Sequence, residues 1–318
     1  MPAEFVHATA AGGRRVVACH SVGTTVNFVH NWPSTFNVGD FLCSPRHYFD
    51  FTCLPPEESG FARITVVGGG AFNDLGSQAA IDCGGQHNVA WGIGRSIQFA
   101  DRDRAVKPTA DNFDVAGWRD PDLCATGANL VPCASVFHDI TDISPGSETG
   151  IFLNANPAAS GVGDVPARNA NFATGTNALG EAELCARFAR TGKIVTNSYH
   201  IAYWGFLSGR EVAVIGYSSK FASLLELFGL PATVIEYERG NGDGLRQAVE
   251  EALRAQSWLR LERPEQTKDA LRSLNLAFAE RLVRHRLFSS IRPVGSSLER
   301  TRRREVEIWS CYELRLRS

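Results

Sequence analysis

The sequence lacks long apolar runs and a recognisable leader. Its longest apolar stretches, such as 63–68 and 211–217, are strand-sized, whereas a helix that spans a bilayer needs about 20 apolar residues. The first residues, Met-Pro-Ala-Glu-Phe, do not show the basic and then apolar segments of a secretory signal. These absences exclude a membrane-spanning protein and predict a cytoplasmic location.

Metal and cofactor motifs are also missing. The eight cysteines contain no Cys-x-x-Cys pair, and the eight histidines contain no His-x-x-x-His pair. This scatter predicts reduced, mostly buried thiols and no zinc site. Neither Gly-x-Gly-x-x-Gly nor a Walker motif occurs, so no nucleotide cofactor is expected.

Charge is nearly balanced overall but uneven along the chain. The net charge of −2 argues against a dedicated nucleic-acid binder. Residues 281–318, with ten arginines and four glutamates, carry +6, and the rest carries −8. The densest cluster, Arg300, Arg302, Arg303 and Arg304, is a candidate for peripheral contact with an anionic membrane. The alternative is that these arginines pair with acidic groups of the protein itself.

Strands followed by glycine-rich turns and helices predict an α/β fold with two Rossmann-like domains. In the first half the expected strands are 16–19, 64–67, 89–91 and 111–116. In the second half they are 151–155, 193–196, 211–216 and 232–235, with helices at 178–191, 198–207 and 218–228. The expected units are an N-terminal domain over 1–145, a second domain over 146–240, and C-terminal helices with a basic tail over 241–318. Such sheets bind ligands at the carboxyl ends of their strands.

The stretch Thr196-Asn197-Ser198-Tyr199-His200 joins an expected strand to an expected helix. Asn197 or Ser198 can cap that helix, whose free N–H groups form an anion site. His200 is then either a general acid or base, an anion ligand, or a structural histidine. Ser218-Ser219-Lys220 repeats the arrangement one unit later, and the two motifs together predict a pocket for phosphate or carboxylate.

Polar groups of the first half are candidates for the other side of the cleft. Asn37 and Asp40 lie at a helix start, where Asp40 either caps the helix or accepts a sugar hydroxyl. The glycines allow close approach of a ligand to the backbone, and each arginine either faces the cleft or lies on the surface. Cys133 with His138 is a weak candidate for a nucleophile and base. The remaining candidates of this side are Gly68, Gly69, Gly70, Arg95 and Arg119.

Taken in order, these motifs resemble the polysaccharide pyruvyl transferase family. The resemblance rests on Asn37-Val38-Gly39-Asp40, Val66-Val67-Gly68-Gly69-Gly70, Trp91-Gly92-Ile93-Gly94, Trp118-Arg119-Asp120, Val131-Pro132-Cys133-Ala134-Ser135 and Thr196-Asn197-Ser198-Tyr199-His200. It implies a GT-B-type arrangement of the two domains. It also implies transfer of pyruvate from phosphoenolpyruvate to a sugar as a ketal, with His200 as the proton shuttle.

The resemblance also implies which residues bind donor and acceptor. The family commonly reads Ser-x-Arg-Leu-His where this chain has Ser198 at the arginine position, so Lys220, Arg210 or Arg168 must hold the donor anion. Asp40 and the glycines 68–70 would face the acceptor, a sugar or lipid-linked oligosaccharide of bacterial surface-polysaccharide synthesis. No metal or organic cofactor is implied. Two alternatives stay open: a GT-B glycosyltransferase that uses a nucleotide sugar, and a non-catalytic glycan-binding relative.

Overall fold

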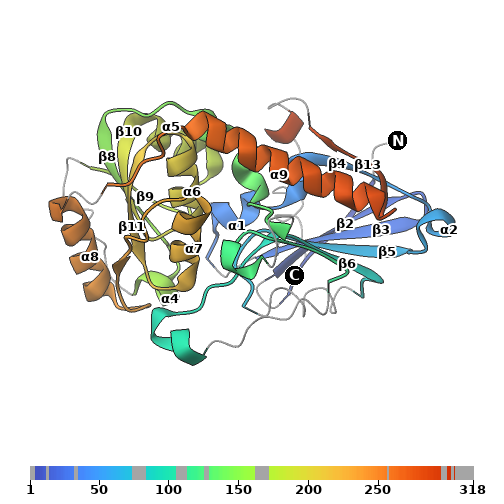
Figure 1. The fold of residues 1–318 in the computed structure, drawn as a ribbon, viewed down its shortest axis with the longest axis horizontal. Helices are drawn as coiled ribbons and strands as arrows, with labels where there is room; N and C mark the ends of the chain where they lie inside the picture. The colour runs from blue at the N-terminus through green and yellow to red at the C-terminus, as the bar shows by residue number, and fades with distance from the viewer. Residues whose placement is uncertain are drawn as a thin grey trace.

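The structure is a computed structural model that describes residues 4–11, 14–31, 35–73, 84–104, 113–124, 129–161, 172–255, 258–294, 299–301 and 304. It is an α/β protein with two parallel-rich sheets that lie side by side (Figure 1). This confirms the coarser part of the predicted fold class, an α/β protein with two parallel-rich sheets, whereas the GT-B-type arrangement and the domain bounds stay predictions. Among the described residues, no helix is both long and apolar enough to cross a membrane.

The N-terminal sheet has six strands in the order β1-β2-β3-β5-β6-β7. The first three strands pair antiparallel, and β3, β5, β6 and β7 pair parallel. Strands β5 and β6 are nearly continuous apolar runs because both faces of a parallel sheet are covered. Their bounds are β1 Glu4–Ala11, β2 Arg14–Ser21, β3 Thr24–Asn31, β5 Arg63–Gly68, β6 His87–Ile93 and β7 Val115–Trp118.

The second sheet is parallel throughout, with five strands in the order β12-β11-β10-β8-β9. The expected strands at 151–155, 193–196 and 211–216 correspond to β8, β10 and β11, whereas β9 was not expected. The strands are β8 Glu148–Leu153, β9 Ala173–Thr176, β10 Thr191–Thr196, β11 Glu211–Gly216 and β12 Ile235–Glu236. The helices are α4 Pro157–Ser160, α5 Glu181–Arg190, α6 Tyr199–Leu207, α7 Ser219–Leu227 and α8 Gly242–Ala255.

One long helix, α9 (Pro264–Arg284), contributes to the cores of both halves. Leu271 belongs to the apolar core around the second sheet, while Phe278 and Leu282 belong to the core around the first. Figure 1 shows α9 in orange, running across the top of the molecule from one half to the other. Beyond it, β13 (Phe288–Pro293) pairs antiparallel with β4 (Phe49–Cys53) of the N-terminal half.

The short elements complete the description. Helix α1 (Val38–Leu42) follows β3, and α2 (Pro56–Ser59) follows β4. Two 3₁₀ turns, η5 (Ala134–Phe137) and η6 (Asp139–Asp142), connect the two sheets. The other 3₁₀ turns are η1 Pro45–His47, η2 Phe99–Arg104 and η3 Pro121–Leu123. All six cysteines that the structure describes are free thiols.

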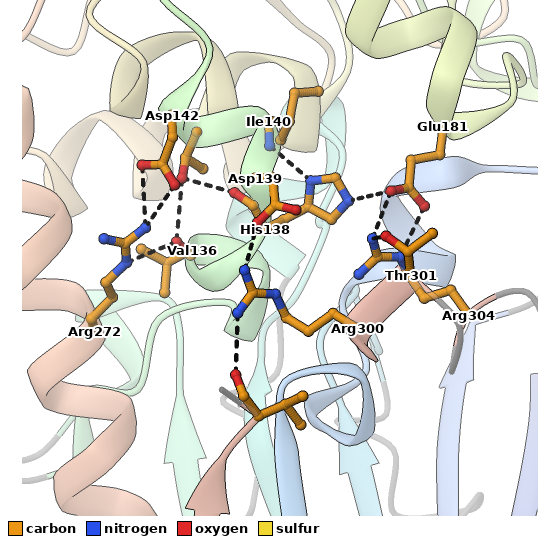
Figure 2. A network of polar contacts seen from close by, with 12 residues as sticks. Val136, His138, Asp139, Ile140, Asp142, Glu181, Arg272, Arg300, Thr301 and Arg304 are labelled. Atoms are coloured by element: carbon orange, nitrogen blue, oxygen red, sulfur yellow. Dashed lines mark hydrogen bonds and ion pairs between the residues drawn. The ribbon is translucent and has the colours of Figure 1, made fainter. Parts of the chain in front are cut away.

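Arg300 and Arg304 make charged contacts with η6 of this connection and with α5 (Figure 2). Arg300 pairs with Asp139 at 2.6 Å, and Arg304 donates to both carboxylate oxygens of Glu181 at 2.9 and 2.7 Å. His138 lies 3.1 Å from the same carboxylate. Arg300 and Arg304 therefore pair within the protein. The membrane hypothesis is left with Arg302 and Arg303, which lie outside the described residues, and stays a prediction.

Glu181 is the centre of this network. Burial alone would raise the pKa of its carboxyl group, but the hydrogen bond and charge of His138 and the charge of Arg304 together lower it from 4.5 to about 2. A pKa lower in the folded than in the unfolded chain stabilises the fold above the unfolded value. This contribution is therefore present at neutral pH and is lost as the pH falls from about 4.5 towards 2.

Replacing Arg304 by alanine leaves the Glu181 carboxylate with His138 alone. Because loss of one partner from a buried ion pair is strongly destabilising, we expect Arg304→Ala to lower the free energy of unfolding in urea by about 3 kcal/mol at neutral pH. The matched control is Arg284→Ala, which removes the exposed pair with Glu280 and should change that free energy by less than about 1 kcal/mol. Equal stabilities of the two variants would contradict the assigned role of Arg304.

Candidate functional site

A cavity of about 200 Å³ lies where the carboxyl ends of the two parallel sheets face each other. The N-terminal sheet supplies residues at or after the ends of β3, β5, β6 and β7, which are Asn31, Gly70, Ser96 and Arg119. The second sheet supplies residues after all five of its strands, which are Asn154, Asn177, Ser198, Tyr217 and Arg239. This is the edge at which open parallel sheets bind ligands.

Hydrogen bonds join the two halves on both sides of the cavity. On one side the Ser219 N–H donates to the Ile97 carbonyl at 2.8 Å, and the hydroxyls of Ser96 and Ser218 lie 2.7 Å apart. On the other side the Val38 N–H donates to the Asn177 carbonyl at 2.8 Å. At the start of α7, where the sequence predicted part of an anion site, the Ser219 N–H is thus occupied by the Ile97 carbonyl of the other half. Ser218 and Ser219 therefore hold the two halves together.

Arg119 carries the positive charge at the centre of the cavity. Its side chain is 1% exposed, and its guanidinium carbon lies 4.0 Å from the centre of the Tyr199 ring. Its Nε is 3.4 Å from Asp120, but among the described residues its two terminal nitrogens have no hydrogen-bond partner. A buried guanidinium with free donors in a cavity wall is a group prepared for an anion.

The N-terminus of α6 adds further donors beside Arg119. The Ser198 N–H is bound to the Thr196 hydroxyl at 3.0 Å, whereas no partner among the described residues accepts from the N–H groups of Tyr199 and His200. Ser198, Tyr199 and His200 all line the cavity. The positive end of the helix dipole lies at the same place. The donors on which the predicted anion site at 197–200 depends are therefore free among the described residues, and the binding of an anion there stays a prediction.

Two more cations line the cavity on the side of β11 and β12. Lys220 donates to the Tyr217 hydroxyl at 2.7 Å, and the guanidinium of Arg239 lies 5.7 Å from the centre of the Tyr217 ring. Neither side chain has a carboxylate partner among the described residues. Among the described residues that line the cavity there are thus three cations, Arg119, Lys220 and Arg239, and one acidic group, Asp40.

Asp40 is an acid with a strongly shifted pKa. It lies in α1, where the Asn37 amide donates to its carboxylate at 2.9 Å. Burial raises the pKa of Asp40 from 3.8 to about 6, and the charges of Lys220 and Arg119 limit the rise. A carboxyl group with this pKa can both donate and accept a proton near neutral pH.

His200 is held in its neutral form. Burial lowers its pKa well below the ordinary value of 6.5, and the positive charges of Arg119 and Lys220 lower it further. Its Nε2 lies 3.7 Å from the Cys133 sulfur, and its ring packs so closely on Gly39 that a Cβ there would lie 2.3 Å from Nδ1. Of the two groups, Asp40 rather than His200 has the pKa that suits proton donation.

Several predicted site residues lie outside the cavity wall. Asn197 accepts from the Asn154 N–H and donates to the Tyr237 hydroxyl, so it braces strand ends. Arg210 is buried and donates to four backbone carbonyls, those of Ile143, Ser144, Phe188 and Thr191.

Of the residues predicted to bind the acceptor, Arg95, Gly68 and Gly69 do not line the cavity, and of those predicted to bind the donor, Arg168 cannot be placed. Arg95 pairs with Asp122. Gly68 and Gly69 pack against Pro45 and Cys43, where a Cβ would lie 2.3 and 2.2 Å from side-chain atoms. Arg168 lies outside the described residues. The predicted residues that do meet in the cavity are Asn37, Asp40, Gly70, Arg119, Ser198, His200 and Lys220.

The sequence reasoning missed the asparagines of the second half. Asn154 and Asn177 directly follow β8 and β9, and Asn156 follows two residues after Asn154. An asparagine immediately after a strand of a parallel sheet was the available signal, but β9 is short and was not recognised. The sequence suggested His138 as the histidine beside Cys133, whereas the Cys133 sulfur lies 3.7 Å from Nε2 of His200.

No family model, curated protein or solved structure matches the chain.

The shifted pKa of Asp40 can be checked by stability measurements. A pKa higher in the folded than in the unfolded chain means that the ionised carboxylate destabilises the fold, with a cost that grows between about pH 4 and 6 and is complete above it. Asp40→Asn should therefore raise the Tm at pH 7.5 and leave it unchanged near pH 4. Asp269→Asn, at an exposed position on α9, is the control for a general charge effect. A Tm difference that is equal at both pH values would contradict the assigned titration.

Proposed function

We propose that this chain transfers pyruvate from phosphoenolpyruvate to a sugar of a cell-surface polysaccharide or of its lipid-linked precursor, forming a ketal. The observation that carries the proposal is the guanidinium of buried Arg119 beside the N-terminus of α6, whose Nε pairs with Asp120 while its two terminal nitrogens have no partner among the described residues. Asp40, with a pKa of about 6, lines the same cavity. The ordered series of motifs that resembles the pyruvyl transferases supports the same assignment.

The charges of the cavity suit this donor. Phosphoenolpyruvate carries a phosphate and a carboxylate, about three negative charges near neutral pH. Arg119, Lys220 and Arg239 offer three positive charges, and α6 offers N–H donors. In this proposal Arg119, stacked over Tyr199, supplies the guanidinium that the family motif places at position 198. Lys220 assists it, as the sequence suggested, whereas Arg210 is committed elsewhere.

Binding of the donor would also adjust the two titrating groups. A trianion beside Asp40 and His200 offsets the field of Arg119 and Lys220, which raises the pKa of both groups. Asp40 would then be protonated near neutral pH at the moment when the donor needs an acid.

In the proposed reaction each proton has a donor and an acceptor. Asp40 gives its proton to the CH₂ carbon of the donor, and the double-bond electrons form the new C–H bond, which leaves an oxocarbenium centre at C2. The oxygen of one sugar hydroxyl bonds to C2, and its proton passes through neutral His200 back to Asp40. The C2–O bond to phosphate then breaks with its electron pair on phosphate. A second hydroxyl adds to C2 and closes the ketal, and its proton leaves with phosphate.

The architecture and size of the cavity favour pyruvyl transfer over a glycosyltransferase that uses a nucleotide sugar and over a relative that only binds glycans. Two parallel-rich sheets whose carboxyl ends face one shared cavity are compatible with a GT-B-type arrangement. The cavity measures about 200 Å³, below the about 300–1,000 Å³ that is typical of sites for organic ligands. Phosphoenolpyruvate is smaller than a nucleotide sugar and leaves more of that space to the acceptor. A relative that only binds glycans would not need a guanidinium with two free nitrogens beside an acid of pKa about 6.

Arg119 is the first residue to test. We expect Arg119→Lys, which keeps the charge but loses the fork of donors, to weaken phosphoenolpyruvate binding by about 10-fold or more, in line with hydrogen bonds to charged groups. The measurement is calorimetric titration with phosphoenolpyruvate. Arg95→Lys is the matched control, since Arg95 pairs with Asp122 outside the cavity wall. Unchanged affinity in Arg119→Lys, or wild-type binding of a nucleotide sugar instead, would refute the proposal.

His200 is tested by turnover. His200→Ala should slow phosphate release from phosphoenolpyruvate in the presence of acceptor by about 10²–10⁴-fold, the usual contribution of a proton-transferring group. Cys133→Ala removes the sulfur beside His200 without changing the cavity wall and should keep turnover within a few-fold of wild type. Wild-type turnover in His200→Ala would remove the histidine from the mechanism, and loss of turnover in Cys133→Ala would reopen the cysteine as a nucleophile.

A further inference from the structure

The cavity has two chemically different ends. The strand order β12-β11-β10-β8-β9 puts Arg239 and Lys220 after β12 and β11 at one end, and the start of α6 after β10 in the middle. At the other end, after β8 and β9, the wall consists of amide side chains. We call these residues, Asn154, Asn156 and Asn177, the amide wall.

Each amide of the wall is held in one orientation by the backbone. The side-chain oxygen of Asn154 accepts from the Asn156 N–H at 3.0 Å, and that of Asn156 accepts from the Ala158 N–H at 3.0 Å. The oxygen of Asn177 accepts from the Ala155 N–H at 2.8 Å. Because each oxygen must face a backbone N–H, each NH₂ group points away from that contact. Among the described residues no group accepts from any of the three NH₂ groups.

The side chain of Asn177 is nearly buried and has an NH₂ group without a protein partner among the described residues, which indicates a ligand. The Asn177 side chain is only 2% exposed, and it lines the cavity. A nearly buried NH₂ group without a partner costs stability, because water no longer solvates it fully. Such a group is expected where a ligand supplies the missing acceptor. The amide wall is therefore a row of three fixed hydrogen-bond donors that bear no charge.

Asp40 lies beside this wall. The Val38 N–H donates to the Asn177 carbonyl, which attaches the first turn of α1 to the end of β9, and Asp40 is two residues further along the same helix. Phe36, just before α1, also lines the cavity and offers an aromatic face. Fixed donors and an aromatic ring are thus gathered at one end of the site, and Asp40, on which the charges of Lys220 and Arg119 also act, lies between this end and the cations.

We propose that the amide wall is the acceptor subsite and that it binds an uncharged sugar through its hydroxyl oxygens. The inference rests on the proposed function, since it assigns the cationic end to the donor. The three NH₂ groups donate to hydroxyl oxygens, and Asp40 accepts the proton of the hydroxyl that reacts. Asp40 remains an acceptor contact, as the sequence suggested, and the amide wall adds contacts at the carboxyl ends of β8 and β9 that the sequence did not suggest.

Charge decides between a neutral and an acidic sugar. The three cations lie at or near the donor end, where phosphoenolpyruvate matches them with about three negative charges. A uronate carboxylate at the amide wall would meet no cation of its own and would face both Asp40 and the donor carboxylate. Repulsion between such groups at short range disfavours an acidic sugar.

The test uses serine substitutions that keep the backbone contacts. Asn154 and Asn156 each accept from the N–H two residues ahead, a turn that serine can also form. The double variant Asn154→Ser/Asn156→Ser therefore removes two NH₂ donors and keeps both turns. Asn241→Ser is the matched control, because Asn241 accepts from the Gly244 N–H at the start of α8 and does not line the cavity.

Binding is measured by calorimetry on the full chain, first with phosphoenolpyruvate and then, with and without it, with methyl glycosides of glucose, galactose, mannose and N-acetylglucosamine and with methyl glucuronide. We expect wild type and Asn241→Ser to bind at least one neutral glycoside more tightly than the glucuronide. The double variant should bind that glycoside about tenfold more weakly, as expected for two lost neutral hydrogen bonds, and should bind phosphoenolpyruvate as wild type does.

The outcomes separate this inference from the proposed function. If wild type fails to bind phosphoenolpyruvate but binds a neutral glycoside that the double variant binds more weakly, the donor assignment fails and the sugar subsite stands. The inference is overturned by tighter binding of the glucuronide, by equal glycoside affinity in wild type and double variant, or by no binding of any neutral glycoside.

Discussion

A guanidinium that is almost fully buried, with its two outer nitrogens unpaired, is the constraint on which the rest of the site depends. Arg119 is positioned by the end of β7, by Asp120 and by the ring of Tyr199. In a region of low dielectric its charge acts on every titrating neighbour. Burial is the main cause of both shifted pKa values; Arg119 lowers the pKa of His200 further and, with Lys220, limits the rise in the pKa of Asp40. One fixed cation therefore acts on both groups that could move a proton.

That arrangement requires two sheets to keep a fixed separation. Arg119 and Asp40 come from the N-terminal half, and His200 and Lys220 come from the second half. The hydrogen bonds of Ser219 and Val38 join the halves on either side of the cavity, and α9 packs into both cores. The Glu181 network adds charged contacts at the connection between them. Each of these contacts links residues that are distant in the sequence.

Local sequence patterns predicted the elements whose apolar residues run continuously. Strands β5, β10 and β11 were expected within a few residues because buried parallel strands are apolar on both faces. Strand β3 was missed because Thr, Asn and His interrupt its apolar residues, and β9 was missed because it has only four residues. Local propensity is weak for such short segments, which tertiary pairing stabilises.

The site shows the same division between local and distant causes. Motifs 196–200 and 218–220 look alike in sequence, and both begin helices after parallel strands. Only the first keeps a free helix start, because the Ile97 carbonyl occupies the second. That contact joins residues more than 100 positions apart, so no local pattern could reveal it. Arg119 was recognised as a candidate, but its burial against Tyr199 depends on the same distant packing.

The position of α9 has a consequence for how the molecule can be divided. When the chain is cut at the connection between the sheets, the N-terminal half loses Phe278 and Leu282 of α9 from its core, and the second half loses Val38 and Phe41 of α1 from its core. Neither half then retains a full core. The two halves resemble repeated modules in their topology but are not independent in their folding. Evolution can therefore exchange loops at the rim of this site more readily than it can exchange one half for another.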